Sequence, residues 1–177
     1  MREFKSNNVI IRKFNMKDVS KAESVITLDA EMTRLAIKSA INEFYTDEPT
    51  WAVENKKSKN LIGYIKVNNF SSKNRICNIK WFMSEKYWDE ESMIDAITKV
   101  CNFLFTKKNV DLVESTYYIN TLDEDKKGNI MKNVGMKQEA VLRNRRINKD
   151  TNIKEDYIVY SVDKKEFMEN SAYNKWE

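Results

Sequence analysis

Apolar residues recur along this chain with two different periods, which separate predicted strands from predicted helices. A period of two is typical of half-buried strands, and a period near 3.6 is typical of amphipathic helices. Segments with the strand pattern lie at 9–14, 51–54, 61–67, 75–83, 110–118, 136–145 and 153–162. Segments with the helical pattern lie at 16–28, 31–44, 89–105 and 123–134, and the polar tail from Asp163 is expected to be partly helical.

The segment at 89–105 shows the most extended helical pattern. Its apolar positions share one face: Met93, Ala96, Ile97, Val100, Cys101 and Leu104. Asp is a favoured N-cap residue, so we expect this helix to begin at Asp89 within a residue or two, with the Asp89 carboxylate accepting from the first amides. Gly135 is expected to end the 123–134 helix in the left-handed conformation.

The order of the elements predicts a mixed sheet with helices on both faces. A strand–helix–strand passage connects 75–83 to 110–118, whereas short turns separate most other strands. Such a passage joins parallel strands by a right-handed crossover, and short turns join antiparallel strands. We therefore predict an α/β fold with a mostly antiparallel central sheet and one parallel strand–helix–strand unit, formed by a single domain over residues 1–177.

Composition narrows the chemistry available to the chain. Its 177 residues include no His and two Cys, Cys77 and Cys101. Without His, Ser-His-Asp and Cys-His nucleophile systems and His-ligated zinc are excluded. Two Cys cannot form a disulfide framework or a four-Cys zinc site, so we expect no metal and a reducing, cytoplasmic environment. Both thiols lie on apolar segments and are expected to be packed rather than reactive.

The charge balance favours neither a membrane nor a nucleic acid as a partner. Lys and Arg number 31 against 27 Asp and Glu, a net charge of +4 spread along the chain. The densest basic clusters, at 56–59 and 143–146, are explained equally well by solvated loops. No apolar run is long enough for a signal peptide or a membrane span.

Four short stretches, in this order and spacing, resemble the GNAT superfamily of N-acetyltransferases. VIIRKFNMKDV at 9–19 is similar to the family's opening strand and helix start, and LIGYI at 61–65 to its x-I-G-x-I strand. KYWDEESMIDAI at 86–97 follows the frame E-Y-W-G-K-G-Y-x-x-E-A, and IMKNVGMKQEAVLRN at 130–144 follows V-L-E-K-L-G-F-x-x-E-G-x-L-R. The resemblance covers about 9–163 and points to the branch of ribosomal-protein N-terminal acetyltransferases.

The resemblance implies an activity, a co-substrate and a position for it. Family members transfer an acetyl group from acetyl-CoA to an amine, and the CoA pyrophosphate lies on amides at the start of the long central helix. On this resemblance the acetyl-CoA site comprises Phe82, Met83, Trp88, Asp89, Glu90, Glu91, Ser92, Met93, Glu124 and Lys127. The acceptor is expected to be a small-molecule or peptide amine, and the protein a monomer or homodimer.

The loop expected to hold the pyrophosphate departs from the family pattern. Where the family has W-G-K-G-Y, this chain has Trp88, Asp89, Glu90, Glu91 and Ser92. A phosphate about 5 Å from one carboxylate is repelled by roughly 1–3 kcal/mol at an effective dielectric of 20–80. The three acids therefore predict weak acetyl-CoA binding, although they also suit an ordinary, well-capped helix start.

Other family positions are replaced as well. A Glu ten residues before the loop Trp, usable as a base through water, is Asn78 here, and a strand glycine is Lys80. An Asn that helps hold the pantetheine arm corresponds to Glu124, and a Ser that faces the leaving thiolate corresponds to Lys127. Lys127 could stabilise thiolate charge or contact a phosphate, but a solvated helix lysine is the commoner explanation.

Glu54, Glu114 and Tyr117 are the candidates to replace the missing base. Strand alternation places Glu114 and Tyr117 on opposite faces, so at most one of these two candidate catalytic residues faces the acceptor cleft. A half-exposed strand residue is the commoner explanation of Glu114. Trp81 and Tyr117 are the candidates to line an acceptor pocket between the two halves of the sheet.

Two interpretations of function stay open at this point. The first is an N-acetyltransferase that acts on a protein N-terminus or a small amine through a modified CoA site. The second is a catalytically degenerate relative that uses the emptied cleft as a binding or regulatory module. Family resemblance favours the first, whereas Asn78, Glu124 and the acidic loop favour the second. A basic RNA-associated protein is a third interpretation and the least favoured.

Overall fold

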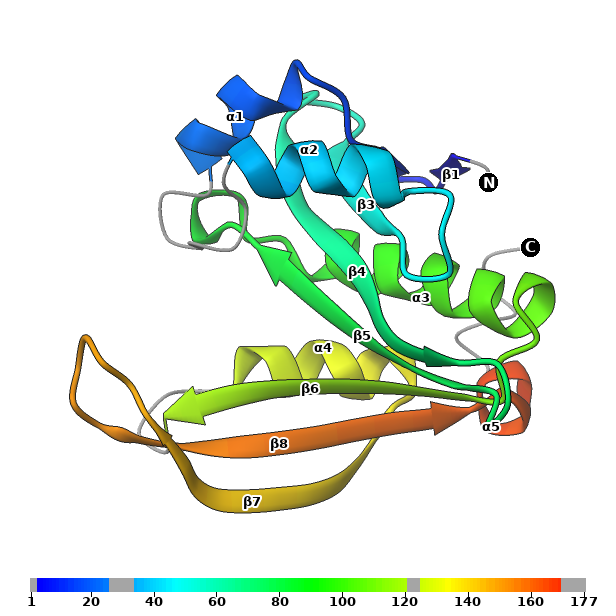
Figure 1. Cartoon of the computed structure of the whole chain (residues 1–177), viewed down its shortest axis with the longest axis vertical. Coiled ribbons are helices and arrows are strands. Elements are labelled where there is room, and N and C mark those ends of the chain that lie inside the picture. The colour runs from blue at the N-terminus through cyan, green and yellow to red at the C-terminus, as the bar shows by residue number, and fades with distance from the viewer. Residues whose placement is uncertain (1–2, 26–33, 121–124, 170–177) are drawn as a thin grey trace.

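A mixed sheet with helices on both faces forms the part of the chain that the computed structural model describes, residues 3–25, 34–120 and 125–169 (Figure 1). The strands are β1 (Phe4–Lys5), β2 (Val9–Lys13), β3 (Thr50–Asn55), β4 (Leu61–Ser71), β5 (Ile76–Met83), β6 (Leu112–Asn120), β7 (Lys137–Ile147) and β8 (Lys154–Asp163). The helices are α1 (Asp18–Val25), α2 (Arg34–Glu43), α3 (Glu90–Lys107), α4 (Lys126–Val134) and α5 (Lys164–Glu169), with a 3₁₀ turn at Glu85–Tyr87.

The eight strands lie in the order β1-β2-β3-β4-β5-β6-β8-β7. Neighbouring strands are antiparallel except β5 and β6, which run parallel and are connected through α3. This confirms the predicted parallel pair and the predicted fold class. Among the described residues, no helix has both the length and the apolar character needed to cross a membrane.

The two faces of the sheet support two separate apolar clusters. On β3, Trp51 and Val53 belong to the larger cluster, whereas Ala52 between them belongs to the smaller one. The smaller cluster contains Ile37 of α2, so α2 covers the face to which Ala52 points. The larger cluster contains residues of α3 and α4, including Ile130, and these helices cover the opposite face.

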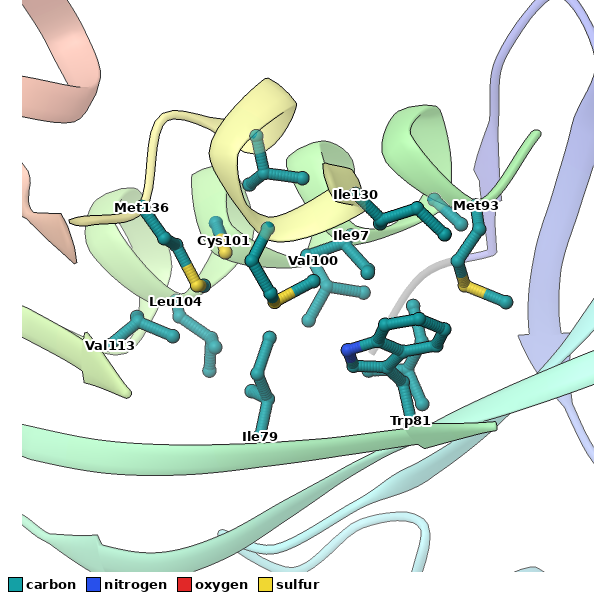
Figure 2. Close-up of a cluster of buried hydrophobic side chains, with 14 of the residues drawn as sticks. Ile79, Trp81, Met93, Ile97, Val100, Cys101, Leu104, Val113, Ile130 and Met136 are labelled. Atoms are coloured by element: carbon teal, nitrogen blue, oxygen red, sulfur yellow. The ribbon is translucent and has the colours of Figure 1, made fainter. Parts of the chain in front are cut away.

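The larger cluster holds the long helix against the centre of the sheet. Figure 2 shows Ile79 and Trp81 of β5 pointing toward apolar side chains of α3 and α4, among them Val100 and Ile130. Full burial of each large apolar side chain contributes roughly 1.5–3 kcal/mol. The start of α3 is therefore fixed relative to β5, which positions the region described below.

Gly63 explains one of the sequence motifs. A Cβ atom at this position would lie 2.1 Å from the carbonyl oxygen of Phe82 on the neighbouring strand. Any side chain would push β4 away from β5, so glycine is required inside this strand.

The opening motif forms an ion-pair network beside α1. The Arg12 guanidinium contacts Asp18 at 2.8 Å and Glu54 at 2.7 Å, and Asp18 is almost fully buried. The hydrogen bonds to Asp18 and Glu54 raise the pKa of Arg12 against the opposing effect of burial. Glu54 is thus committed to an ion pair on β3, which leaves it unsuited to the role of a free general base.

Two helix ends match the sequence prediction, whereas α1 and α4 begin two and three residues after their predicted starts, at Asp18 and Lys126. Asp89 is the N-cap of α3, and its side chain accepts from the Ser92 amide at 3.4 Å, as predicted. Gly135 ends α4 with φ of 97° in the left-handed region, also as predicted. Strand β4 continues to Ser71, beyond the predicted end at Val67, because Asn68 and Ser71 keep pairing with β5 across a register shift.

Candidate functional site

The parallel strands β5 and β6 separate from each other halfway along their length. Their pairing joins Ile76–Ile79 to Leu112–Ser115, although β5 continues to Met83 and β6 to Asn120. Figure 1 shows the two strands diverging toward their C-terminal ends. The backbone edges that face each other beyond Ile79 and Ser115 are therefore free of mutual sheet pairing.

Two adjoining cavities lie where these strands diverge. One, of about 480 Å³, is lined by residues from β5 and β6 that include Trp81 and Ser115. The other, of about 580 Å³, extends toward the start of α4 and is lined by Trp88. Both cavities are lined by Tyr117, Tyr118 and Lys127, so we treat them as one cleft, called the strand cleft below.

Tyr117 lines both cavities of the strand cleft. It is buried, and its hydroxyl donates to the Asp125 carboxylate, with O···O distances of 2.8 and 2.9 Å. Burial, followed by this bond to Asp125, raises the pKa of Tyr117 well above its usual range. Tyr117 therefore holds its proton at neutral pH, and its hydroxyl is oriented by Asp125.

Asp125 also caps helix α4. Its carboxylate accepts the Gly128 amide at 2.8 Å, and a Cβ at Gly128 would lie 2.3 Å from Asp125 Oδ2 and 2.8 Å from the Tyr160 hydroxyl. The rings of Tyr117 and Tyr160 stack at 6.2 Å with planes 9° apart. The missing side chain at Gly128 thus lets a carboxylate and two tyrosines meet at one end of the cleft.

Lys127 lies in the strand cleft and is half-buried. Its ammonium lies 5.3 Å from the ring centroid of Trp81 and 5.7 Å from that of Tyr117. The sequence favoured a solvated helix lysine here; the side chain is half-buried and lies over two aromatic rings. The structure brings together Trp81, Tyr117 and Lys127, the side chains proposed from the sequence as acceptor and thiolate contacts.

The start of α3 is acidic and closed by its own cap. Asp89 accepts the Ser92 amide and, at 2.5 Å, the Ser92 hydroxyl. Glu90 accepts from the Trp88 indole at 3.5 Å, and Glu91 is exposed. An incoming phosphate would meet three carboxylates here, and Asp89 already occupies one of the free amides.

Two lysines of α4 line the 580 Å³ cavity, together with the carboxylates of Glu85, Asp125 and Glu155. The ammonium of Lys126 lies 5.9 Å from the Trp88 ring centroid, and Lys126 and Lys127 both line the 580 Å³ cavity. Both lysines belong to the first turn of α4. The cation expected by family resemblance on α3 is absent from its place, but two cations face the region from α4.

Other predicted acetyl-CoA contacts fall in different environments. Phe82 is half-buried, lines the 480 Å³ cavity and stacks on Tyr64 at 5.7 Å. Met83 and Met93 are buried in the larger apolar cluster. Glu124 lies outside the described residues.

Glu114 lies on the face of β6 opposite to Tyr117, as alternation predicts. It is half-buried beside Asn78, its register partner, and lines neither cavity of the strand cleft. Both cysteines are buried, and burial raises the pKa of Cys77 to about 12. Burial raises the pKa of Cys101 as well, so both thiols are unreactive at neutral pH.

Sequence reasoning missed several residues that line the cleft. Arg146, taken from the sequence as part of a solvated cluster, stacks on Tyr118 at 4.1 Å and pairs with Glu155 at 2.5 Å. Asp125 was also missed, although an Asp three residues before Gly128 at a helix start is a capping signal. Its contact with Tyr117 depends on how α4 meets β6, which local sequence does not encode.

Solved structures with a similar fold include several acetyltransferases. A GCN5-related N-acetyltransferase from Brucella melitensis matches with a TM-score of 0.75 at 14% identity, covering 99% of this chain and 85% of that one. A ribosomal-protein alanine acetyltransferase from Vibrio fischeri matches with a TM-score of 0.74 at 14% identity, covering 92% and 97%. A chimeric spermidine N-acetyltransferase from Vibrio cholerae matches with a TM-score of 0.73 at 14% identity, covering 92% and 99%. At these identities the likeness establishes the fold.

Sequence comparison establishes the family. No curated protein matches the chain significantly. The model of the acetyltransferase (GNAT) domain matches residues 5–137, which include the opening motif, the glycine strand and the whole of α3. The similar fold of the solved acetyltransferases agrees with this match. The chain therefore belongs to the GNAT acetyltransferase family.

Proposed function

We propose that this protein is an N-acetyltransferase that transfers the acetyl group of acetyl-CoA to a primary amine, either a protein N-terminus or a small amine. The observation that carries the proposal is the strand cleft, which opens through the sheet and is lined by Lys127 in both of its cavities. A cleft open on both sides of a sheet allows a thioester and an amine to approach each other from opposite directions.

Acetyl transfer from a thioester to an amine involves three bond changes. The amine nitrogen attacks the thioester carbonyl and loses a proton, the C–S bond breaks, and the thiolate takes a proton. Negative charge develops first on the carbonyl oxygen and then on sulfur, and preorganised cations and donors stabilise it. We assign Lys127 to this stabilisation because its ammonium lies over Trp81 and Tyr117 in the cleft.

The residues at the start of α3 fit a pyrophosphate poorly, whereas those at the start of α4 fit it better. Asp89, Glu90 and Glu91 repel phosphate at the family's usual position. Lys126 and Trp88 line the 580 Å³ cavity, which Glu85, Asp125 and Glu155 also line, and they offer a cation and an aromatic surface. We infer that CoA binds through these groups and through backbone amides along the free edge of β5, with weak affinity.

Titration of acetyl-CoA followed by a thiol-release assay with primary amines tests this proposal. Acetyl-CoA at 100 times its dissociation constant should stabilise the fold by about 2.7 kcal/mol, a measurable rise in the thermal midpoint. Lys127→Met should lower kcat by about tenfold or more, because it removes charge stabilisation in the transition state. Lys132→Met, on the exposed side of the same helix, is the matched control and should leave kcat unchanged.

The acidic start of α3 favours a second candidate function, a degenerate relative that binds another ligand in the cleft. The Asp89 carboxylate accepts a hydrogen bond from the Ser92 amide, as an ordinary N-cap does. A protein that shows neither stabilisation by acetyl-CoA nor thiol release with any amine would support this second candidate over the enzyme.

A further inference from the structure

Two lysines lie directly across from each other on the face of the sheet that α2 covers. Lys66 of β4 and Lys80 of β5 are register partners, and both line a cavity of about 420 Å³ together with Thr50 and Asn68. Like charges directly opposite on neighbouring strands destabilise a sheet. This pairing therefore concentrates positive charge at one point of the cavity wall.

Opposing charge in the cavity is small and already engaged. Glu43 is the single carboxylate that lines it in the described part of the chain, and it accepts a hydrogen bond from the Ser39 hydroxyl at 2.6 Å. Neither Lys66 nor Lys80 is within ion-pair distance of an acid among the described residues. An anion placed between the lysines would relieve their mutual repulsion.

This cavity adjoins the strand cleft. Tyr64 and Lys80 line both the 420 Å³ cavity and the 480 Å³ cavity, which also contains Trp81, Tyr117 and Lys127. No carboxylate lines the 480 Å³ cavity in the described ranges. A ligand that extends from Tyr117 toward α2 would thus meet Lys80 and then Lys66.

We propose that Lys66 and Lys80 form an anion-binding subsite for the acceptor, and that the acceptor is a primary amine with a carboxylate at its far end. The inference rests on the proposed acetyl transfer, because that function places the reacting amine near Tyr117 and Lys127. A diamine would place its second ammonium against two lysines and be repelled. The subsite therefore selects against polyamines and for acidic amines.

Matched acceptors of similar length test the charge preference. We would compare γ-aminobutyrate, butylamine and putrescine, whose far ends are a carboxylate, a methyl group and an ammonium. The expected kcat/KM for γ-aminobutyrate exceeds that for butylamine by about tenfold or more, and putrescine is the poorest. A fourth acceptor, aminopropylphosphonate, distinguishes a preference for carboxylate from a preference for phosphate. A higher kcat/KM for aminopropylphosphonate than for γ-aminobutyrate would overturn the carboxylate assignment.

Variants connect the preference to the lysine pair. Lys80→Gln and Lys66→Gln should each lower kcat/KM for γ-aminobutyrate by about tenfold, whereas kcat/KM for butylamine should stay the same. Lys80→Glu should reverse the order, so that putrescine is preferred. Lys73→Gln, at an exposed position in the turn between β4 and β5, is the control and should preserve the wild-type order. Equal use of all acceptors by the wild type would overturn the proposal.

A binding measurement separates this inference from the proposed function. Calorimetric titration of γ-aminobutyrate in the absence of acetyl-CoA should show binding that Lys80→Gln weakens and that added salt weakens. Such binding without any acetyl transfer would contradict the enzyme and retain the anion subsite. Acetyl transfer with no charge preference would retain the enzyme and overturn the subsite.

Discussion

Helices α3 and α4 use the same kind of N-cap residue, but their first turns carry opposite charge. Asp89 caps α3 and Asp125 caps α4, and each carboxylate accepts the amide three residues later, from Ser92 and from Gly128. The next two residues are Glu90 and Glu91 in α3 and two lysines in α4.

The difference separates a helix start that obeys local stability rules from one that breaks them. Acids in the first turn interact favourably with the helix dipole, whereas cations there are unfavourable by about 0.3–1 kcal/mol each. The α3 start is thus stabilising and the α4 start is not. Positions that break a local rule without a structural gain are where function is expected. Lys126 and Lys127, rather than the family's usual loop, are therefore the positions where function is expected.

The largest effect is expected at Gly128. Gly128→Ala places a Cβ against the Asp125 carboxylate, which must move and release the α4 amide, the Tyr117 hydroxyl or both. Loss of a cap removes about 0.5–2 kcal/mol, and a buried hydroxyl without a partner a further 1–3 kcal/mol, against roughly 1 kcal/mol gained in helix propensity. We expect a net loss of about 2 kcal/mol in the free energy of unfolding, measured in urea.

Asn129→Ala, on the exposed surface of the same helix, is the control for Gly128→Ala and should change stability by no more than about 0.5 kcal/mol. A Gly128→Ala variant as stable as the wild type would mean that Asp125 rearranges freely, and that the carboxylate does not hold Tyr117.

The next effect tests the acidic start of α3 directly. Replacing Asp89 and Glu91 with Gly and Glu90 with Lys should strengthen acetyl-CoA binding by about tenfold or more, since the relieved repulsion exceeds roughly 1.4 kcal/mol. The same change should lower helix stability by about 1–2 kcal/mol through lost cap and dipole interactions. Calorimetric titration with acetyl-CoA at low and high salt measures the gain in affinity and the extent to which salt reduces it.

Raised salt should narrow the difference between the triple variant and the wild type, because screening weakens the repulsion that the variant removes. Micromolar binding of acetyl-CoA by the wild type would contradict the charge argument and would favour the enzyme over the degenerate relative.

The smallest effect concerns a further acid of α3. Asp95 is almost fully buried, and burial raises its pKa, offset only in part by Ser6, Lys99, the Asn8 backbone and Lys56. The folded state therefore holds the proton more tightly than the unfolded state, and stability falls as pH rises above the unfolded value of about 3.9.

Asp95→Asn removes this titration, so urea midpoints between mildly acidic and neutral pH should decline less with pH than in the wild type. Glu91→Gln, at an exposed position of the same helix, should leave the decline in place. An unchanged profile in Asp95→Asn would show that Asp95 is paired in solution, and that α3 tolerates all of its acids.

Features set by local sequence could be predicted, and features set by contacts across elements could not. Asp89, Gly135 and the parallel β5–β6 pair follow from capping preferences, left-handed glycine and the strand–helix–strand order. The sequence showed Gly63 as part of a strand motif. The reason for this glycine, the close approach of the Phe82 carbonyl on the neighbouring strand, is visible only in the paired sheet.

The residues of the strand cleft show why the candidate site was harder to predict from the sequence than the fold. The bond between Tyr117 and Asp125 and the position of Lys127 depend on how α4 rotates against the sheet. The Lys66–Lys80 pair depends on the register of β4 and β5, which a shift between Asn68 and Ser71 adjusts. Periodicity identifies faces and not such registers, so these contacts lay beyond the sequence.

Strand β7 is the last strand of the sheet, and its outer edge has consequences for how the protein behaves in concentrated solution. Val141 and Leu142 are exposed there, and a bare strand edge is a template for adding a strand of another molecule. Asn144, with φ of 55°, interrupts the edge within a register shift, and arginines flank it. High salt screens the charges of these arginines but does not remove the register shift at Asn144. The bent backbone therefore opposes the addition of a further strand at this edge even at high ionic strength.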